Sequence, residues 1–119
     1  MTQADLPAIR QLAQNGAFSI TSHAYDQMRD RGITYDDVES ILTSATNQII
    51  ETQSPSRTPG KAHADERVLL YDPCGGKDAI VIFVALLVPA PDLRIVTVEH
   101  VDNAKWERKG GQVPCLVRK

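Results

Sequence analysis

Apolar residues recur every three or four positions in three segments of the first 45 residues, which are 5–16, 20–32 and 34–45. A recurrence with this period predicts amphipathic helices. A small polar residue lies at or next to the start of each segment and a glycine ends the first two, as helix caps and stops require. The expected caps are Asp5, Thr21 or Ser22, and Thr34, and the expected stops are Gly16 and Gly32. The third helix is expected to bury a stripe that ends at Ala45.

After residue 45 the apolar period becomes two, which predicts strands. The four strands expected are 47–52, 67–72, 78–88 and 93–100, and the last three are joined by the turn sequences "PCGGK" and "PAPD". Short turns favour antiparallel neighbours. Helices and strands in separate runs indicate an α+β protein. We therefore predict one domain, residues 1–119, with three N-terminal helices packed on a four-stranded antiparallel sheet centred on 78–88.

Composition adds constraints on environment. The chain is 42% hydrophobic and 24% charged, as in ordinary soluble proteins. Its longest apolar run, "AIVIFVALLV", is about half a membrane span, and no secretory signal precedes the first helix. A cytoplasmic protein without membrane contact is expected, with Cys74 and Cys115 as free thiols. The Pro- and Ser-rich segment 53–65 is expected to be the most mobile internal loop.

Charge is distributed unevenly along the chain. The net charge of −2 combines −4 up to residue 52, −1 from 53 to 93 and +3 from 94 to 119. An acidic protein of this kind is not a general nucleic-acid binder. The basic tail nevertheless leaves room for one small anion site.

The second predicted helix carries a polar stripe of candidate functional residues. His23, Gln27 and Arg31 are spaced i, i+4, i+8, so they follow one side of the helix, with Arg29 nearby. Metal-free RNA cleavage needs proton transfer and a fixed cation at the phosphate. His23 could supply the acid or base and Arg31 the cation, with the tail folded back to the same side. The alternative is that His23 packs or caps, and that the arginines cap carbonyl groups and pair with Asp26 and Asp30.

Two further groups of residues carry candidate chemistry. Glu99 and His100 end the last predicted strand, where only one of them can face a given site because neighbouring side chains alternate. On a regular strand His100 shares its side with Val96 and Val98. The segment "KWERK" combines cations with the only tryptophan, which suits stacking on a base or, alternatively, closure of the core. Its residues are Lys105, Trp106, Arg108 and Lys109, with Glu107 between them.

These residues also carry a resemblance. "SHAYDQMRDRGITYDDVESIL", followed by strands and "IVTVEHVDNAKWERKG", resembles the bacterial domain-of-unknown-function family 4258 over about residues 19–109, with 1–18 as an extension helix and 110–119 as a tail. The matching positions are His23, Ala24, Met28, Arg31, Gly32, Ile33, Val38 and Leu42. Gln27 stands where the family pattern has arginine, which removes a cation from the stripe, and the loop 53–65 looks longer than in the pattern.

That family is in turn similar to the RelE-type and BrnT-type ribonuclease toxins of toxin–antitoxin pairs. The resemblance implies a RelE-like or barnase-like fold and a metal-independent, cofactor-free endoribonuclease. Its partners would be RNA and a cognate antitoxin protein, with homodimerisation left open. We expect catalysis by His23, Arg31, Glu99 and His100, and RNA binding by Gln27, Arg29, Lys105, Trp106, Arg108 and Lys109. Two alternatives are a non-catalytic protein-binding module and an RNA binder that does not cleave.

Overall fold

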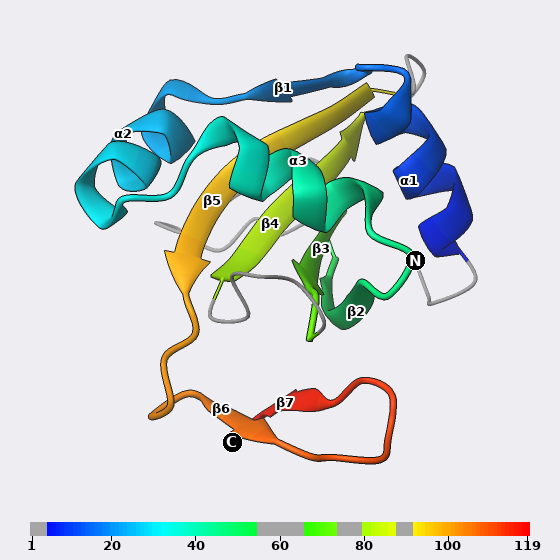
Figure 1. Cartoon of the computed structure of the whole chain (residues 1–119), viewed down its shortest axis with the longest axis vertical. Helices are drawn as coiled ribbons and strands as arrows, with labels where there is room; N and C mark the ends of the chain where they lie inside the picture. The colour runs from blue at the N-terminus through cyan, green and yellow to red at the C-terminus, as the bar shows by residue number, and fades with distance from the viewer. Residues whose placement is uncertain (1–4, 55–65, 74–79, 88–91) are drawn as a thin grey trace.

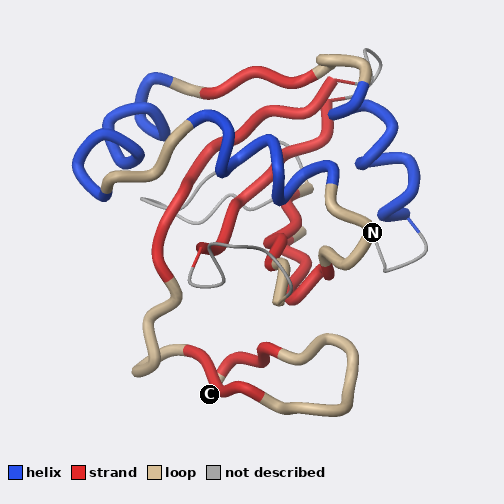
Figure 2. Tube along the Cα trace, viewed as in Figure 1, coloured by secondary structure: helices blue, strands red, loops and turns tan. Residues whose placement is uncertain are grey.

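Three helices cover one face of a mixed sheet, and a C-terminal hairpin lies against the other face (Figures 1 and 2). The computed structural model describes residues 5–54, 66–73, 80–87 and 92–119, with the backbone alone at 81–83 and 85–87. The helices are α1 (Leu6–Gln14), α2 (Ser22–Arg31) and α3 (Tyr35–Thr43). The predicted α+β class is confirmed.

Local sequence signals explain where α2 and α3 begin and end. The Thr21 hydroxyl accepts a hydrogen bond from Ala24 N at 3.1 Å, which caps α2. Gly32 ends the helix in the left-handed region at φ 68°, where a side chain would be strained. A capping box formed by Thr34 and Asp37 begins α3. The predicted caps and stop of these helices are therefore confirmed, although α3 ends at Thr43, before the predicted end of its buried stripe.

The sheet has five strands in the order β1-β5-β4-β3-β2. They are β1 (Phe18–Ile20), β2 (Gln48–Gln53), β3 (Arg67–Tyr71), β4 (Ile80–Leu87) and β5 (Asp92–His100). Strands β2 to β5 are antiparallel neighbours, and β4 is central as predicted. The expected four-stranded, wholly antiparallel sheet is wrong, because β1 pairs in parallel with β5. A strand of three residues is too short to produce a recognisable alternation in the sequence.

A β-bulge in β5 changes the direction of its C-terminal side chains. Thr97 pairs with Phe83 and Ile95 with Val84, so Val96 has no partner on β4. The extra residue shifts the alternation by one position. Val98 therefore faces the helices together with Ile95, and both are fully buried. The predicted grouping of His100 with Val96 is wrong for this reason.

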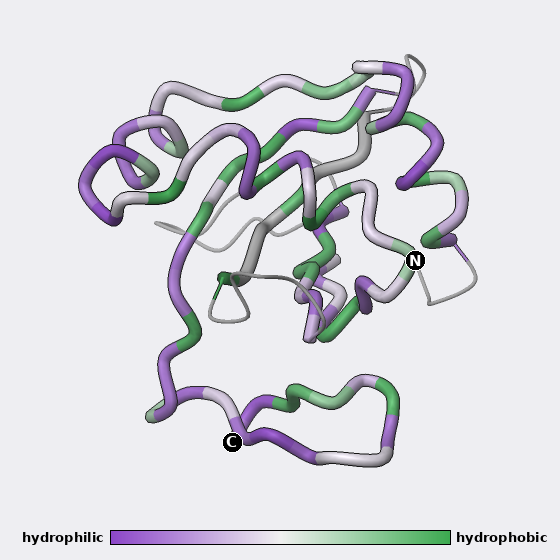
Figure 3. The backbone as a smooth tube through the Cα atoms, in the orientation of Figure 1, coloured by the Kyte–Doolittle hydropathy of each residue, from purple (hydrophilic) through white to green (hydrophobic). Residues whose placement is uncertain are grey.

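Two hydrophobic clusters form the core, one on each face of the sheet. The helix-side core joins the buried faces of α1, α2 and α3 to the sheet. The hairpin-side core joins Ile50, Leu69, Tyr71, Trp106 and Leu116, with Val101 and Cys115 packed against them. Figure 3 shows why α2 contributes little to burial, since most of its trace has the hydrophilic colour. Ala45, expected in the stripe of the third helix, is exposed.

The hairpin of β6 (Trp106–Arg108) and β7 (Leu116–Arg118) was not predicted from the sequence. Its strands are as short as β1, and they pack on residues that lie far away in the sequence.

The loop 53–65 is expected to be mobile, but most of it, residues 55–65, lies outside the described residues. Cys74, expected to be a free thiol, also lies outside them. No helix in the described ranges is long and apolar enough to cross a membrane.

Candidate functional site

The site begins where β1 stops covering the edge of β5. Backbone pairing between the two strands runs from Phe18 to Ile20, and Thr21 N adds a last hydrogen bond to Ile95 O at 3.1 Å. Beyond this point the chain turns into α2. The outer backbone groups of β5 near its C-terminal end then need partners other than a strand, because an unpaired sheet edge is both costly and prone to association.

Two side chains of α2 supply those partners. Val98 N donates to Gln27 Oε1 at 2.8 Å, and Arg31 Nη1 donates to Val98 O at 2.6 Å. Gln27 and Arg31 lie one helical turn apart, so together they reach both backbone groups of a single strand residue. We call this arrangement of Gln27, Arg31 and Val98 the edge clamp. It is a structural role for two residues of the predicted functional stripe.

The clamp positions two histidines. His23 lies one turn before Gln27, and its Nε2 is 3.0 Å from Gln27 Nε2. His100 Nε2 lies 3.1 Å from Arg31 O, where it satisfies a carbonyl group of the last turn of α2. Both histidines are exposed. The structure thus brings together His23, Gln27, Arg31 and His100, which we call the helix-edge site.

The two arginines of α2 differ in their charge partners. Arg29 is exposed and pairs with Asp26 at 3.2 Å and with Asp30 at 3.7 Å. Arg31 makes no ion pair within the described part of the chain, and its single side-chain hydrogen bond leaves most of its donors for other groups. Arg31 is therefore the cation of this helix that is open to an anion. The alternative of charge pairing with Asp26 and Asp30 describes Arg29 only.

Glu99 faces the hairpin rather than the helix-edge site. It alternates with Val98 and His100 along β5, and its charge acts on Arg118 of the hairpin. Hydrogen bonding to Glu51 raises the pKa of Arg118, and the charges of Glu51 and Glu99 add to that rise. Of the last two residues of β5, His100 therefore belongs to the helix-edge site and Glu99 does not.

The predicted base-stacking residue is buried. Trp106 is 2% exposed and lies in the hairpin-side core, with the Arg118 guanidinium 4.4 Å from its ring centre. A ring held in this way is not free to stack on a base. Arg118 also donates from Nε and Nη2 to the two carboxylate oxygens of Glu51, at 2.7 and 2.8 Å. These hydrogen bonds lower the pKa of Glu51 against the opposing effect of burial.

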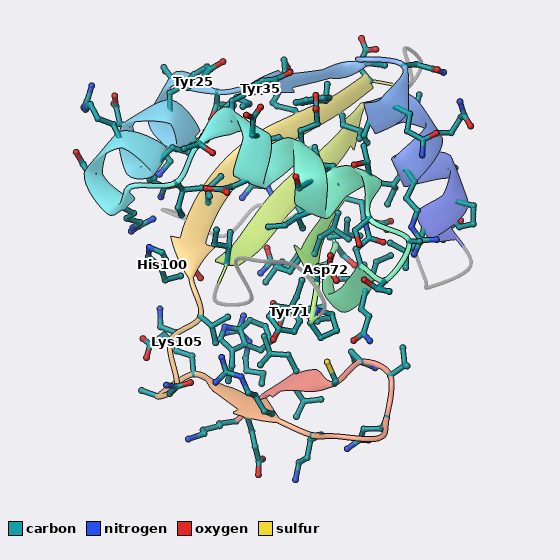
Figure 4. The ribbon with its side chains drawn as sticks, in the orientation of Figure 1. Tyr25, Tyr35, Tyr71, Asp72, His100 and Lys105 are labelled. Carbon is teal, nitrogen blue, oxygen red and sulfur yellow. The ribbon has the colours of Figure 1, made fainter. Side chains whose placement is uncertain are left out.

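Within the ranges that the structure describes, the remaining cations of the tail have local partners or none. Arg108 donates to Asn103 at 2.9 Å, and Lys109 pairs with Glu107 at 3.1 Å. The side chain of Lys105 is exposed and lies below His100 in Figure 4. In the described residues no hydrogen bond or ion pair joins these tail cations to His23 or Arg31. The shared anion site of helix and tail therefore stays a prediction, with Lys105 as the tail cation nearest His100 in sequence.

No cluster of three or more His, Cys, Asp or Glu side chains that could hold a metal ion occurs in the described ranges.

The sequence alone does not predict that the backbone of Val98 is the partner of the polar stripe, because this contact depends on where β1 ends. One signal was present: glutamine can accept a hydrogen bond as well as donate one, whereas arginine only donates.

The fold and this site define an α+β domain in which a polar helix seals one sheet edge and presents histidines beside it. Residues 20–100 match the family model described as "Domain of unknown function (DUF4258)", and the chain belongs to that family. The match covers more than half of the 119 residues. It includes the whole helix-edge site and excludes α1 and the hairpin. No curated protein and no solved structure matches the chain.

Proposed function

We propose that the chain is a metal-independent endoribonuclease of the toxin type, which binds RNA at the helix-edge site. The observation that carries this proposal is the meeting of Arg31, a cation without a carboxylate partner among the described residues, with two exposed imidazoles. Arg31 would hold a phosphate, and an imidazole would move the proton of the adjacent 2′-hydroxyl. The resemblance to RelE-like and barnase-like folds is part of the same proposal.

Cleavage by this route needs no metal. The 2′-oxygen attacks phosphorus, the bond to the 5′-oxygen breaks, and the products are a 2′,3′-cyclic phosphate and a 5′-hydroxyl. A guanidinium fixed by Val98 O requires little reorganisation as negative charge develops on the phosphate. Lys105 would extend the cationic surface toward the next phosphate. A cytoplasmic location and a cognate antitoxin that covers the site follow from the toxin role.

The decisive test uses purified wild-type protein, a labelled single-stranded RNA, EDTA in excess, and an all-deoxy strand of the same sequence. The proposal expects cleavage of the RNA to products with 2′,3′-cyclic phosphate ends, and no cleavage of the deoxy strand, which lacks the nucleophile. A double variant that lacks both imidazoles, His23→Ala with His100→Ala, is purified in the same way and controls for contaminating ribonuclease. Equal cleavage by wild type and this double variant would contradict the proposal.

A non-catalytic protein-binding module is the second candidate, and two exposed aromatic residues favour it. Tyr25 is 50% exposed and Tyr35 is 45% exposed, and Tyr35 stacks on Phe18 with 5.5 Å between ring centres. Figure 4 shows both tyrosines on the side of the molecule where β1 forms the sheet edge. Exposed aromatic residues beside a strand edge suit protein contacts. In the RNA assay this candidate expects neither binding nor cleavage, whereas binding without cleavage would indicate an RNA binder.

A further inference from the structure

The hydrogen bonds of the helix-edge site determine which ring nitrogen of each histidine carries a proton. A backbone N–H is only a donor, so the group of Gln27 that faces Val98 N at 2.8 Å must be its oxygen. The amide NH₂ of Gln27 therefore faces His23. Because that NH₂ donates, His23 Nε2 must accept, at 3.0 Å. His23 is thus held with its proton on Nδ1.

His100 is held in the opposite form. Its Nε2 lies 3.1 Å from Arg31 O, and a carbonyl oxygen only accepts. The proton must therefore be on Nε2, which leaves Nδ1 as the lone-pair nitrogen of the neutral ring. Neither Nδ1 has a hydrogen bond to any described residue. The exposed nitrogen of His23 is a donor, and that of His100 is an acceptor.

The two rings also differ in what a second proton would do. A proton added to His100 goes to Nδ1 and leaves the bond from Nε2 to Arg31 O intact. A proton added to His23 goes to Nε2, where it meets the NH₂ of Gln27 and breaks that bond. Gln27 cannot turn its oxygen toward His23 without losing Val98 N. Only His100 can gain and lose a proton while its anchoring contact persists.

We infer that His100 is the proton-transfer residue of the helix-edge site, that His23 is a fixed hydrogen-bond donor to the RNA, and that Gln27 is the positioning residue that imposes this difference. The inference rests on the proposed function and assigns its roles. His100 Nδ1 takes the 2′-hydroxyl proton as the 2′-oxygen bonds to phosphorus. The same proton passes through a water molecule to the departing 5′-oxygen, so His100 returns to its starting form. No other reactant is consumed.

The helix geometry agrees with separate roles. His23 and Arg31 lie eight residues apart, which corresponds to about 12 Å along the helix axis. His100 contacts the backbone of Arg31 and so belongs to the distal end of that span. Arg31 and His100 therefore serve one phosphate and its ribose, while Nδ1–H of His23 reaches a neighbouring nucleotide. This reverses the expectation from sequence that His23 is the acid or base.

Two matched substitutions separate the roles. Asparagine at position 23 keeps an N–H donor near the place of imidazole Nδ1, and glutamine at position 100 keeps a donor near the place of Nε2. His23→Asn is expected to retain cleavage within about tenfold, because the donor remains. His100→Gln keeps its contact with Arg31 O and is expected to lose a factor of about 10² to 10⁴, the usual loss on removal of a general acid or base.

The experiment that tests the inference combines these rates with ¹⁵N spectra of the histidine rings in the full chain. The expected wild-type spectra show His23 protonated on Nδ1 and His100 protonated on Nε2. Gln27→Glu keeps the acceptor for Val98 N but removes the donor to His23. In this variant the His23 proton is expected to move to Nε2. Cleavage with the opposite tautomers, or with equal losses in His23→Asn and His100→Gln, would overturn the inference and leave the proposed function standing. The expected tautomers without any cleavage would overturn the proposed function and the proton-transfer role, and leave the positioning role of Gln27 standing.

Discussion

Gln27 accepts a hydrogen bond of 2.8 Å from the backbone N–H of Val98, a residue 71 positions further along the chain. On the edge of β5 that faces β1, backbone pairing ends with the hydrogen bond to Ile95 O, and the contact with Gln27 takes the place of a strand partner beyond it. It also fixes the amide so that its NH₂ group meets His23. One glutamine side chain therefore links the stability of a sheet edge to the state of an exposed histidine, and the first prediction below tests the clamp that makes this link.

Substitution of Gln27 tests the edge clamp through stability. Arginine at this position offers only donors, so Val98 N loses its acceptor, and like charges meet at positions 27 and 31. We expect Gln27→Arg to lower the free energy of unfolding by about 1 to 3 kcal/mol, the range for an unsatisfied buried donor. Gln27→Glu keeps the acceptor and should lose less. Urea unfolding of the two variants measures the difference, and greater stability of Gln27→Arg would contradict the clamp.

Substitutions of Arg31 and Arg29 provide a matched test and control for RNA binding. Arg31 has no carboxylate partner among the described residues, whereas Asp26 and Asp30 neutralise Arg29. We expect Arg31→Met to weaken RNA binding and to reduce the slope of log K against log salt by about 0.7, the value for one phosphate contact with a single strand. Arg29→Met should leave the slope unchanged. Equal effects in a fluorescence titration would show that RNA does not distinguish the two sides of α2.

The ion pair between Glu51 and Arg118 makes hairpin docking sensitive to acid. Hydrogen bonds from Arg118 lower the pKa of folded Glu51 below its ordinary value of 4.5. The pair's contribution is therefore complete above pH 4.5 and declines as the pH falls through the lower, folded-state value. Half-exposed pairs are worth about 0.2–1 kcal/mol. A double-mutant cycle with Glu51→Gln and Arg118→Met should give this coupling at pH 7 and a progressively smaller one as the pH falls below 4.5, and a coupling that stays constant with pH would contradict it.

Trp106 is expected to contribute to the stability of the fold rather than to contact RNA directly. Its ring is 2% exposed beneath Arg118 and contributes to the hairpin-side core. Trp106→Ala should lower the free energy of unfolding by about 3–5 kcal/mol, the usual cost of deleting a buried aromatic side chain. Val113, which is 66% exposed in the same hairpin, provides the control, and Val113→Ala should change stability by less than about 0.5 kcal/mol. Similar values for both, measured by circular dichroism in urea, would refute the buried role.

Local signals in the sequence were sufficient for the helices and for most of the sheet. Thr34 and Asp37 cap α3, and Gly32 ends α2, through contacts within a few residues of chain. The sequence could not show that β1 pairs in parallel with β5 or that Val96 forms a bulge, because both features arise from tertiary contacts. The bulge decides the direction of His100. For the same reason the sequence could place His23, Gln27 and Arg31 on one side of a helix but could not show the hydrogen bonds that join Gln27 and Arg31 to Val98.

The central claim is that RNA binds at the helix-edge site, and an NMR titration of the ¹⁵N-labelled wild-type protein tests it most directly. The titrant is a single-stranded RNA analogue with 2′-deoxy sugars, which cannot be cleaved because it lacks the 2′-hydroxyl nucleophile. The account predicts chemical-shift changes centred on His23, Gln27, Arg31 and His100, with smaller changes at Lys105 and little change at Trp106. Changes centred on the hairpin or on α1, with none at His23, Arg31 and His100, would contradict it.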